Sequence, residues 1–485
     1  MNRLTLAVAV LLLASLVGCL PEEKVVWSPD GQRAAVIAPD GLYLCDGDGR
    51  LSPRVAENVS AAAWLPDSKR LLAVRDTKSP ARTWTDAAAL IDEDMTREVT
   101  AAAAALRKEI LAYAAPPGEF KPKVIEQMGM TQMLLAAMYL RDNQAEGLAE
   151  KLGTTWEDVK KLEMPVYSIE VGEASADAVA LQPVAKVLSA PGYLRISPDG
   201  QHVAYVTGAL LLEGQYALMV LPLAGGRPRI VAGQVAAFAD WSGDGRYLAF
   251  ARTTGPAPKE KGDLRLGTVS RTVVCDEKGG LLEKFPLPQD LAGLVFQETL
   301  RVRGLRDGRI LFAAAPIQLP STTADMPTKA ALFAVDPERP ATLIRMLPRN
   351  AEADVPQGVN YFELSPDQRH VLIPGPKGVA VVTLATGEVV NALAEKEGDL
   401  TLQPVWRSPS EVCFAVAKGS TFGSPNRPEV VLWSAGHWRV LSTAWPDAMV
   451  NGMLGPSSAP PQPKPLPPTG VGPPPEKKEE SKKAP

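Results

Sequence analysis

Short apolar segments recur along the chain, and each of them follows a polar turn. They are rich in β-branched, aromatic and alanine residues, a composition typical of strands buried on both faces. The segments span residues 33–37, 70–74, 202–206, 247–250, 370–373 and 412–416. This pattern predicts a mostly β protein that is assembled from repeated units.

The turn before each segment has a recurring sequence, Trp-Ser-Pro-Asp-Gly in its clearest copy at 27–31. Pro presets φ for a tight turn, Asp bonds nearby backbone, and Gly supplies a positive φ. Further copies lie at 64–68, 196–200, 241–245 and 364–368, with a degenerate copy at 406–410. A residue that returns once per repeat is expected to be structural. We therefore assign a structural turn role to Trp27, Asp30, Gly31, Trp64, Asp67, Asp199, Gly200, Trp241, Asp244, Gly245, Asp367 and Trp406.

The size of one repeat indicates the architecture. In the first repeat, strands are expected at 32–38, 42–46, 51–56 and 59–64, separated by turns. Four strands in roughly 40 residues match one propeller blade. A degenerate copy at 305–312 extends the count. We predict an all-β fold, a β-propeller of about seven four-stranded blades, with six to eight compatible with the spacing.

The repeats resemble the TolB-like, WD-repeat-like β-propeller family, which is common among exported bacterial proteins. The matching features are the turn at 27–31, the strand after it, and Leu-Tyr-Leu-Cys-Asp-Gly-Asp-Gly at 42–49. The resemblance covers most of 25–450, with a gap at about 80–165. It implies the propeller and leaves the function open, since one fold serves many roles. We expect no counterpart of TolB's amino-terminal α/β domain, so TolB's partners are not implied.

The recurring pattern of turns and strands is interrupted at residues 86–163, which we predict to form a helical insertion within blade two. Helices are expected at 86–114, 124–140, 145–152 and 155–162, and the second of them is rich in methionine. Long insertions in repeat proteins often lie on a binding face. The methionines form either the core of a small bundle or an adaptable contact surface. The sequence leaves both interpretations open.

The amino terminus predicts export and lipidation. A basic start precedes a largely apolar run of 14 residues at 4–17, too short for a membrane span. Leu-Val-Gly-Cys at 16–19 resembles a bacterial lipobox, so residues 1–18 would be a signal peptide and Cys19 would be acylated, for example with palmitate. The alternative is an ordinary signal peptide with an incidental Cys. Leu20 favours the outer membrane, facing the periplasm of the cell envelope.

Composition adds few constraints. The chain has 485 residues, 46% of them hydrophobic, and a formal net charge of −4. This allows a large core and argues against nucleic-acid binding, even though 148–159 resembles the turn of a helix-turn-helix. Three cysteines remain after Cys19, too few for a disulfide framework. Cys45 and Cys413 would meet where the ring closes, and a bridge between them stays open.

No residue pattern predicts catalysis, a metal or a cofactor. His202, His370 and His437 lie far apart in the repeats, and no Gly-x-Ser-x-Gly nucleophile motif is present. The acids at 46–48 lack the later ligands of a calcium loop and fit a hairpin turn. The proline-rich tail at 456–485 cannot bury enough apolar surface to fold.

These observations predict a propeller at 19–455 that acts as a lipid-anchored protein-binding or assembly scaffold of the cell envelope, not as an enzyme. Its partner would be an unidentified envelope protein, bound through the 86–163 insertion. The alternative is a propeller enzyme, or a receptor for a small ligand or glycan, with its site at the mouth of the central channel. Ring closure is expected to pair the strand at 25–27 with strands near 430–432 or 439–441.

Overall fold

The computed structural model describes most of the chain in segments. They are residues 24–112, 130–143, 156–208, 216–254, 265–274, 289–296, 301–314, 331–347, 362–375, 378–394, 400–417 and 429–453. The predicted signal peptide, Cys19, Cys275 and the tail at 456–485 lie outside these residues.

The described strands form six antiparallel sheets, each built from strands that follow one another in the sequence. The first three sheets contain, in turn, β1 (Val25–Trp27), β2 (Arg33–Ala38) and β3 (Gly41–Asp46); β4 (Val59–Trp64), β5 (Arg70–Asp76), β6 (Val166–Glu173) and β7 (Gln182–Leu188); and β8 (Gly192–Ile196), β9 (His202–Gly208), β10 (Tyr216–Pro222), β11 (Arg229–Trp241), β12 (Tyr247–Thr254), β13 (Arg265–Val273) and β14 (Gln289–Phe296).

The other three sheets have four strands each. They contain, in turn, β15 (Val302–Gly304), β16 (Ile310–Ala314), β17 (Ala331–Asp336) and β18 (Arg339–Leu347); β19 (Glu363–Leu364), β20 (His370–Gly375), β21 (Gly378–Thr383) and β22 (Val389–Ala394); and β23 (Leu400–Ser408), β24 (Glu411–Ala417), β25 (Glu429–Ser434) and β26 (His437–Val440).

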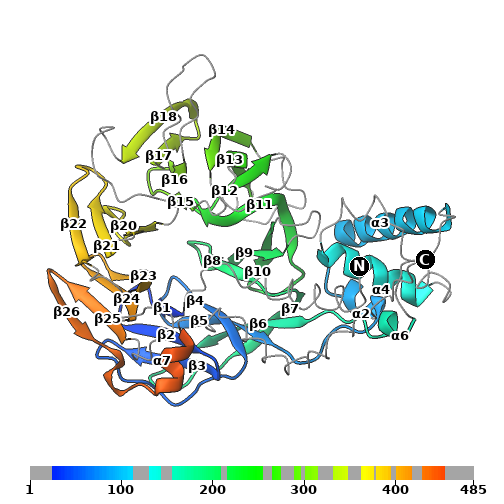
Figure 1. The fold of residues 1–485 in the computed structure, drawn as a ribbon, viewed down its shortest axis with the longest axis horizontal. Helices are drawn as coiled ribbons and strands as arrows, with labels where there is room; N and C mark the ends of the chain where they lie inside the picture. Colours follow the sequence, from blue (N-terminus) through cyan, green and yellow to red (C-terminus); the bar gives the residue numbers. More distant parts are fainter. Residues whose placement is uncertain are drawn as a thin grey trace, which may run out of the picture.

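The sheets lie side by side around a common centre, with β4, β8 and β15 toward it, so the fold is the predicted β-propeller (Figure 1). The seven-stranded sheet is two units joined through the long strand β11. Its first part pairs with β10, and after a register shift between Val235 and Ala239 its last part pairs with β12. The blade count of about seven stays a prediction.

The prediction that the strand at 25–27 pairs with a strand of the last sheet to close the ring is wrong. Among the described residues, strand β1 pairs with β2 alone, and the last sheet consists of β23 to β26. The strand at 430–432 has no free edge, because β25 pairs with β24 on one side and with β26 on the other, through a hairpin that Ala435 and Gly436 close with positive φ values of 47° and 86°. Side-chain packing joins the first and last sheets instead, through Trp27, Leu432 and Leu441 among other residues.

The first sheet also has one strand fewer than expected. Residues 51–56 contribute only isolated bridges, Cys45 with Leu51 and Leu42 with Ala56. Pro53 lies between these two bridges, and proline cannot donate a ladder hydrogen bond. The predicted strand at 59–64 is present as β4, where it starts the next sheet.

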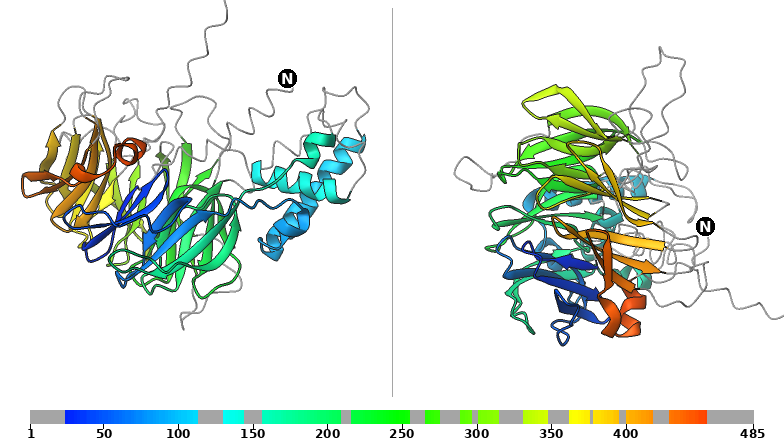
Figure 2. Two further views of the ribbon diagram at one scale, coloured as in Figure 1. Left: turned by 90° about the horizontal axis from the view of Figure 1, so that it is seen from below. Right: turned by 90° about the vertical axis from the view of Figure 1, so that its left-hand side faces the viewer.

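Helices α2 (Trp84–Ala88), α3 (Glu93–Ala112), α4 (Met130–Asn143) and α6 (Trp156–Lys160) lie in the connection between β5 and β6, and they project from one side of the ring (Figure 2). Val99, Ala103, Leu106 and Ile110 line one face of α3 at helical spacing and are buried against α4. Met138 is buried in the same cluster and Met133 packs against it. These two methionines therefore belong to the core of the bundle.

None of the helices that the structure describes combines the length and the apolarity that crossing a membrane requires. The expected helix at 145–152 lies outside the described residues. A further short helix, α7 (Asp447–Met453), follows the last sheet, lies against β2 of the first sheet, and buries Met449 and Val450 in the core that joins the two sheets.

Candidate functional site

The cassette turns form a continuous collar at one end of the ring. In this collar we include residues 27–31, 64–68, 196–200, 240–245, 304–308, 363–368 and 406–410. Each turn lies against the next, and the last contacts the first, since Arg407 Nε donates to the carbonyl of Gly31 at 2.9 Å. The backbone amide of Arg306 likewise donates to Gln368 Oε1 at 2.7 Å. The collar therefore fixes the turns relative to one another.

Hydrogen bonds inside each turn hold it rigid. The Ser28 hydroxyl donates to Asp30 Oδ1 at 2.6 Å, and the same oxygen accepts from the Gln32 amide at 3.0 Å. The equivalent Ser–Asp pairs of the turns at 196–200, 241–245 and 364–368 repeat this arrangement. Gly31 has a φ of 69°, in the left-handed region that glycine adopts without strain. Gly200 and Gly245 take similar values, as does the glycine-free turn at Gln368.

The tryptophans of the turns connect neighbouring sheets. The indole Nε1 of Trp64 donates to the carbonyl of Val26 at 2.9 Å, Trp241 to Arg195 at 2.9 Å, and Trp406 to Glu363 at 3.1 Å. Each bond joins the innermost strand of one unit to that of the next. At the closure, Trp27 lies beneath the guanidinium of Arg407, whose Cζ is 4.9 Å from the ring centroid.

Two of the three histidines lie beside these tryptophans. The rings of His202 and Trp241, and those of His370 and Trp406, have centroids 6.3 Å apart. Burial lowers the pKa of His202, although the charge of Asp199 opposes this effect. His437 is exposed and begins β26 at the final hairpin. The histidines are thus separated, each in its own sheet.

The collar aspartates predict a specific response to acid. Partial burial favours the neutral carboxyl of Asp30, but hydrogen bonds from Ser28 and Gln32 and the charge of Arg33 outweigh it and lower its pKa. The same balance lowers the pKa values of Asp67, Asp199, Asp244 and Asp367. Near pH 4 the unfolded chain therefore binds more protons than the folded chain, so stability falls as the pH drops.

We expect the stability that these aspartates contribute to be complete above about pH 5 and to be lost as the pH falls through the unfolded value near 4 and then through their lowered folded pKa values. Urea midpoints measured from pH 6 to pH 3 would show this loss. A variant carrying D30N, D199N and D367N should be less stable at pH 7 and lose less on acidification. An unchanged pH slope in the variant would contradict the assignment.

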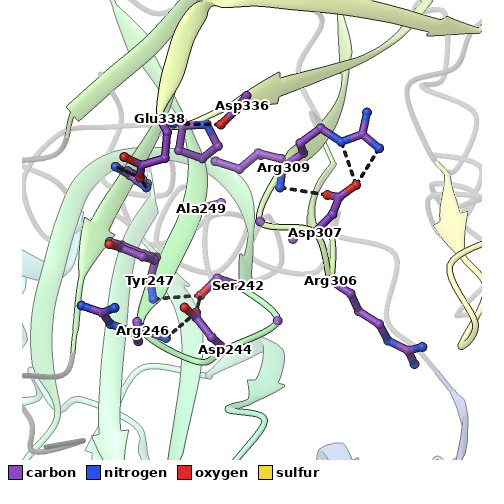
Figure 3. A pocket seen from close by; sticks show the side chains of 16 residues that line it. Ser242, Asp244, Arg246, Tyr247, Ala249, Arg306, Asp307, Arg309, Asp336 and Glu338 are labelled. Carbon is purple, nitrogen blue, oxygen red and sulfur yellow. Dashed lines mark hydrogen bonds and ion pairs between the residues drawn. The ribbon is translucent and has the colours of Figure 1, made fainter. Parts of the chain in front are cut away.

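A cleft opens beside the collar, between the turns at 240–245 and 304–308 (Figure 3). Its volume is about 400 Å³. Tyr247 and Ala249 of β12, together with Arg271 of β13, form one wall. Ile310 of β16 and the β17–β18 turn form the other, so the cleft lies between two neighbouring sheets.

Arg271 is the most enclosed charged group of this cleft. Its side chain is 14% exposed, and its Cζ lies 4.5 Å from the centroid of the Tyr247 ring, a cation–π contact. Arg246 approaches the same ring at 5.7 Å. Both terminal nitrogens of Arg271 contact one carboxylate oxygen of Glu338, at 3.3 Å each. The side chain of Glu338 is 78% exposed.

The other acids of the cleft are engaged in turns. Asp244 Oδ1 accepts from the Ser242 hydroxyl and from the Arg246 amide. Asp307 accepts from the amide and from Nε of Arg309. Asp336 accepts from the Glu338 amide and from Arg339 Nε. Glu338 differs from all three, because its carboxylate contacts only Arg271 among the described residues.

The two sheets that form the cleft approach each other closely, and polar contacts join them. The Gly304 amide donates to Asp240 Oδ2 at 3.1 Å, and a Cβ at Gly304 would come within 2.1 Å of the Trp241 carbonyl oxygen. At the next boundary, between the sheets that begin with β15 and with β19, Glu363 of β19 accepts a hydrogen bond from Arg303 at 2.7 Å and forms an ion pair with Arg301. These contacts hold the sheet that begins with β15, which forms one wall of the cleft, against the sheets on either side of it.

The thiols of Cys45 and Cys413 are both free and buried in the core that joins the first and last sheets. Burial raises the pKa of each thiol to about 12, and for Cys45 the neighbouring Cys413 adds to the rise. A thiol in such an environment is a poor nucleophile near neutral pH. The two cysteines therefore pack as apolar side chains.

The sequence singled out Asp244 of this cleft, as a turn residue, and missed Arg246, Arg271 and Glu338. The Asp-Pro-Glu turn at 336–338 was a readable hairpin signal, but nothing in the sequence places it beside β13. Of the other predicted turn residues, Trp241 and Gly245 lie in the same collar turn as Asp244. Within the described part of the chain, no cluster of three or more His, Cys, Asp or Glu residues has the arrangement of a metal site.

Comparisons with known proteins give similar structures but no family. No protein-family model and no curated protein matches the sequence. A putative TolB from Agrobacterium tumefaciens is 16% identical over 54% of this chain and 83% of its own, with a TM-score of 0.34. An oligogalacturonate lyase in complex with manganese is 9% identical over 85% and 89%, with a TM-score of 0.44. The β-propeller domain of the Trilobed protease from Pyrococcus furiosus is 14% identical over 57% and 90%, with a TM-score of 0.30.

Proposed function

We propose that this chain is a lipid-anchored β-propeller of the bacterial cell envelope that binds a protein partner at the cleft beside its collar and catalyses no reaction. The observation that carries the proposal is the enclosed Arg271 against Tyr247 in a preformed cleft. Arginine and tyrosine are enriched where proteins bind one another. Rigid walls reduce the ordering cost of binding, and the collar supplies that rigidity.

The cleft supports partner binding better than the helical insertion does. In the insertion, the apolar faces of α3 and α4 are buried against each other and against the propeller. Leu111 is the one large apolar side chain that is exposed in its described residues. The cleft, in contrast, presents the exposed side chains of Arg246 and Arg306, which form no ion pair in the described part of the chain.

A second function is supported by the size of the cleft. About 400 Å³ is within the ~300–1,000 Å³ usual for small-molecule sites. A receptor for a small ligand would use the same Arg271 and Tyr247. We rank it second, because two exposed guanidiniums on the rim extend the charged surface beyond the cavity.

In-cell crosslinking followed by affinity capture tests the partner proposal. The variants are R246E with R306E, which reverses the exposed rim of the cleft, and R107E with K108E, a matched double reversal on exposed residues of α3. We expect a discrete envelope partner with the wild type and the α3 variant, and a loss of at least tenfold with the rim variant. Loss only with the α3 variant, or no partner at all, would overturn the proposal.

The lipid anchor predicts a clear change in fractionation. With C19A, the thiol that would accept the acyl group is gone, and at roughly 0.8 kcal/mol per buried methylene the loss of acyl chains removes stable anchoring. We expect the wild type in the membrane fraction and C19A in the soluble fraction of the same cells. Equal membrane association of the two proteins, or no incorporation of labelled fatty acid into the wild type, would contradict the anchor.

A further inference from the structure

We infer that the cleft recognises a carboxylate of an acidic peptide segment, which replaces Glu338 on Arg271. This inference rests on the proposed partner site and names the chemistry that the partner presents there. It depends on three features of the cleft: a held guanidinium, a weakly held acid opposite it, and a cationic rim.

The first feature is the fixed position of Arg271. Stacking on Tyr247 holds the guanidinium at 4.5 Å from the ring, and the side chain is only 14% exposed. Less rotamer freedom is then lost when a ligand binds, since Arg is already ordered. A planar guanidinium presents two parallel N–H groups, which match the two oxygens of a carboxylate.

The second feature is the weak hold of Glu338. Its two contacts with Arg271 are 3.3 Å long and end on a single oxygen, whereas charge-assisted bonds are usually about 2.7–2.9 Å. Glu338 is 78% exposed and lies in the tight turn between β17 and β18, whose last ladder pair is Asp336 with Arg339. An exposed pair of this kind contributes little stability, so an incoming carboxylate can displace it.

The third feature indicates an extended acidic ligand. Arg246 and Arg306 lie on the rim of the same cleft, and both side chains are exposed and without an ion pair in the described part of the chain. Two of the other acids there are already ion-paired, Asp307 with Arg309 and Asp336 with Arg339, and Asp244 offsets part of the charge of Arg246. Displacing Glu338 therefore leaves accessible positive charge both inside the cleft and at its edge, which complements several adjacent carboxylates.

The test uses a fluorescein-labelled tetraglutamate peptide, with tetraglutamine as the uncharged control, and measures fluorescence anisotropy at low salt. We expect the wild-type protein to bind tetraglutamate at least tenfold more tightly than tetraglutamine. R271Q should lose at least tenfold of that affinity, because hydrogen bonds to a charged group are removed. E338Q should bind two- to fivefold more tightly, because the internal competitor has lost its charge.

R339Q is the matched control, because it removes an arginine from the same β17–β18 turn without changing Arg271. It should bind like the wild type. Tighter binding by E338Q cannot result from misfolding, so unchanged or weaker binding there overturns the inference. Displacement of the peptide by an equal concentration of glutarate would also overturn it, because the ligand would then be a small dicarboxylate.

The two proposals fail in different ways. If the crosslinked partner depends on the rim arginines but tetraglutamate binds no better than tetraglutamine, only the carboxylate inference is wrong. If tetraglutamate binds as expected but no protein is captured in cells, the carboxylate site stands and the proposed partner function is wrong.

Discussion

E363A is expected to lower the free energy of unfolding by about 3–5 kcal/mol. Glu363 forms ion pairs with both Arg301 and Arg303, and the three side chains are 11%, 0% and 8% exposed. A guanidinium stays charged at any accessible pH, so the variant leaves two buried cations without the carboxylate that they share. The loss should therefore far exceed that of an exposed pair.

Urea unfolding followed by tryptophan fluorescence measures this loss, and Trp406, which donates to the Glu363 carbonyl, reports on the same boundary. E338A is the matched control, because Glu338 also contacts an arginine but is 78% exposed. It should cost about 1 kcal/mol or less. Similar losses in E363A and E338A would show that the buried pair does not stabilise the ring.

G304A is expected to destabilise the protein by about 3 kcal/mol. The added methyl group would lie within 2.1 Å of the Trp241 carbonyl oxygen, an atom of the neighbouring backbone that cannot rotate away. The two sheets would have to separate, which also stretches the bond from the Gly304 amide to Asp240. The change therefore acts on the boundary beside the cleft.

The control for G304A is G308A, four residues later in the same turn. A Cβ at Gly308 would meet nothing within 4 Å, so only its φ of 85° opposes alanine. That strain should cost about 1 kcal/mol. Thermal unfolding of the two variants, compared with the wild type, separates the close approach from the backbone effect. An equal loss in both would contradict the crowding argument.

The repeated units were predictable because their signals are local. A turn that sets φ with Pro and Gly, followed by a short apolar run, needs no distant partner, and strands β2, β5, β9, β12, β20 and β24 begin where those runs begin or one residue earlier. The start of α2 at Trp84 had a local signal too, a capping box in which Thr83 and Asp86 satisfy each other's amides. That signal was missed.

Contacts between units could not be predicted in this way. The closure prediction was wrong in placing β1 beside the strand at 430–432, because the turn at Ala435 and Gly436 brings β26 onto the edge of β25 that β1 would have needed. Tyr247 and Arg271 lie on the paired strands β12 and β13, whereas Glu338 comes from the β17–β18 turn of the next sheet, and only the packing of the two sheets brings its carboxylate to Arg271. A single sequence carries no signal for that register.

Site-resolved photo-crosslinking in living cells tests the central claim most directly, which is that a protein partner binds at the cleft beside the collar. A photoreactive amino acid is placed in turn at Arg306 and Glu338 on the cleft, and at Arg107 on α3 and Val389 on β22 as exposed controls. The account predicts one adduct from both cleft positions and none from the controls. An adduct only at Arg107, or equal adducts at all four positions, would contradict it.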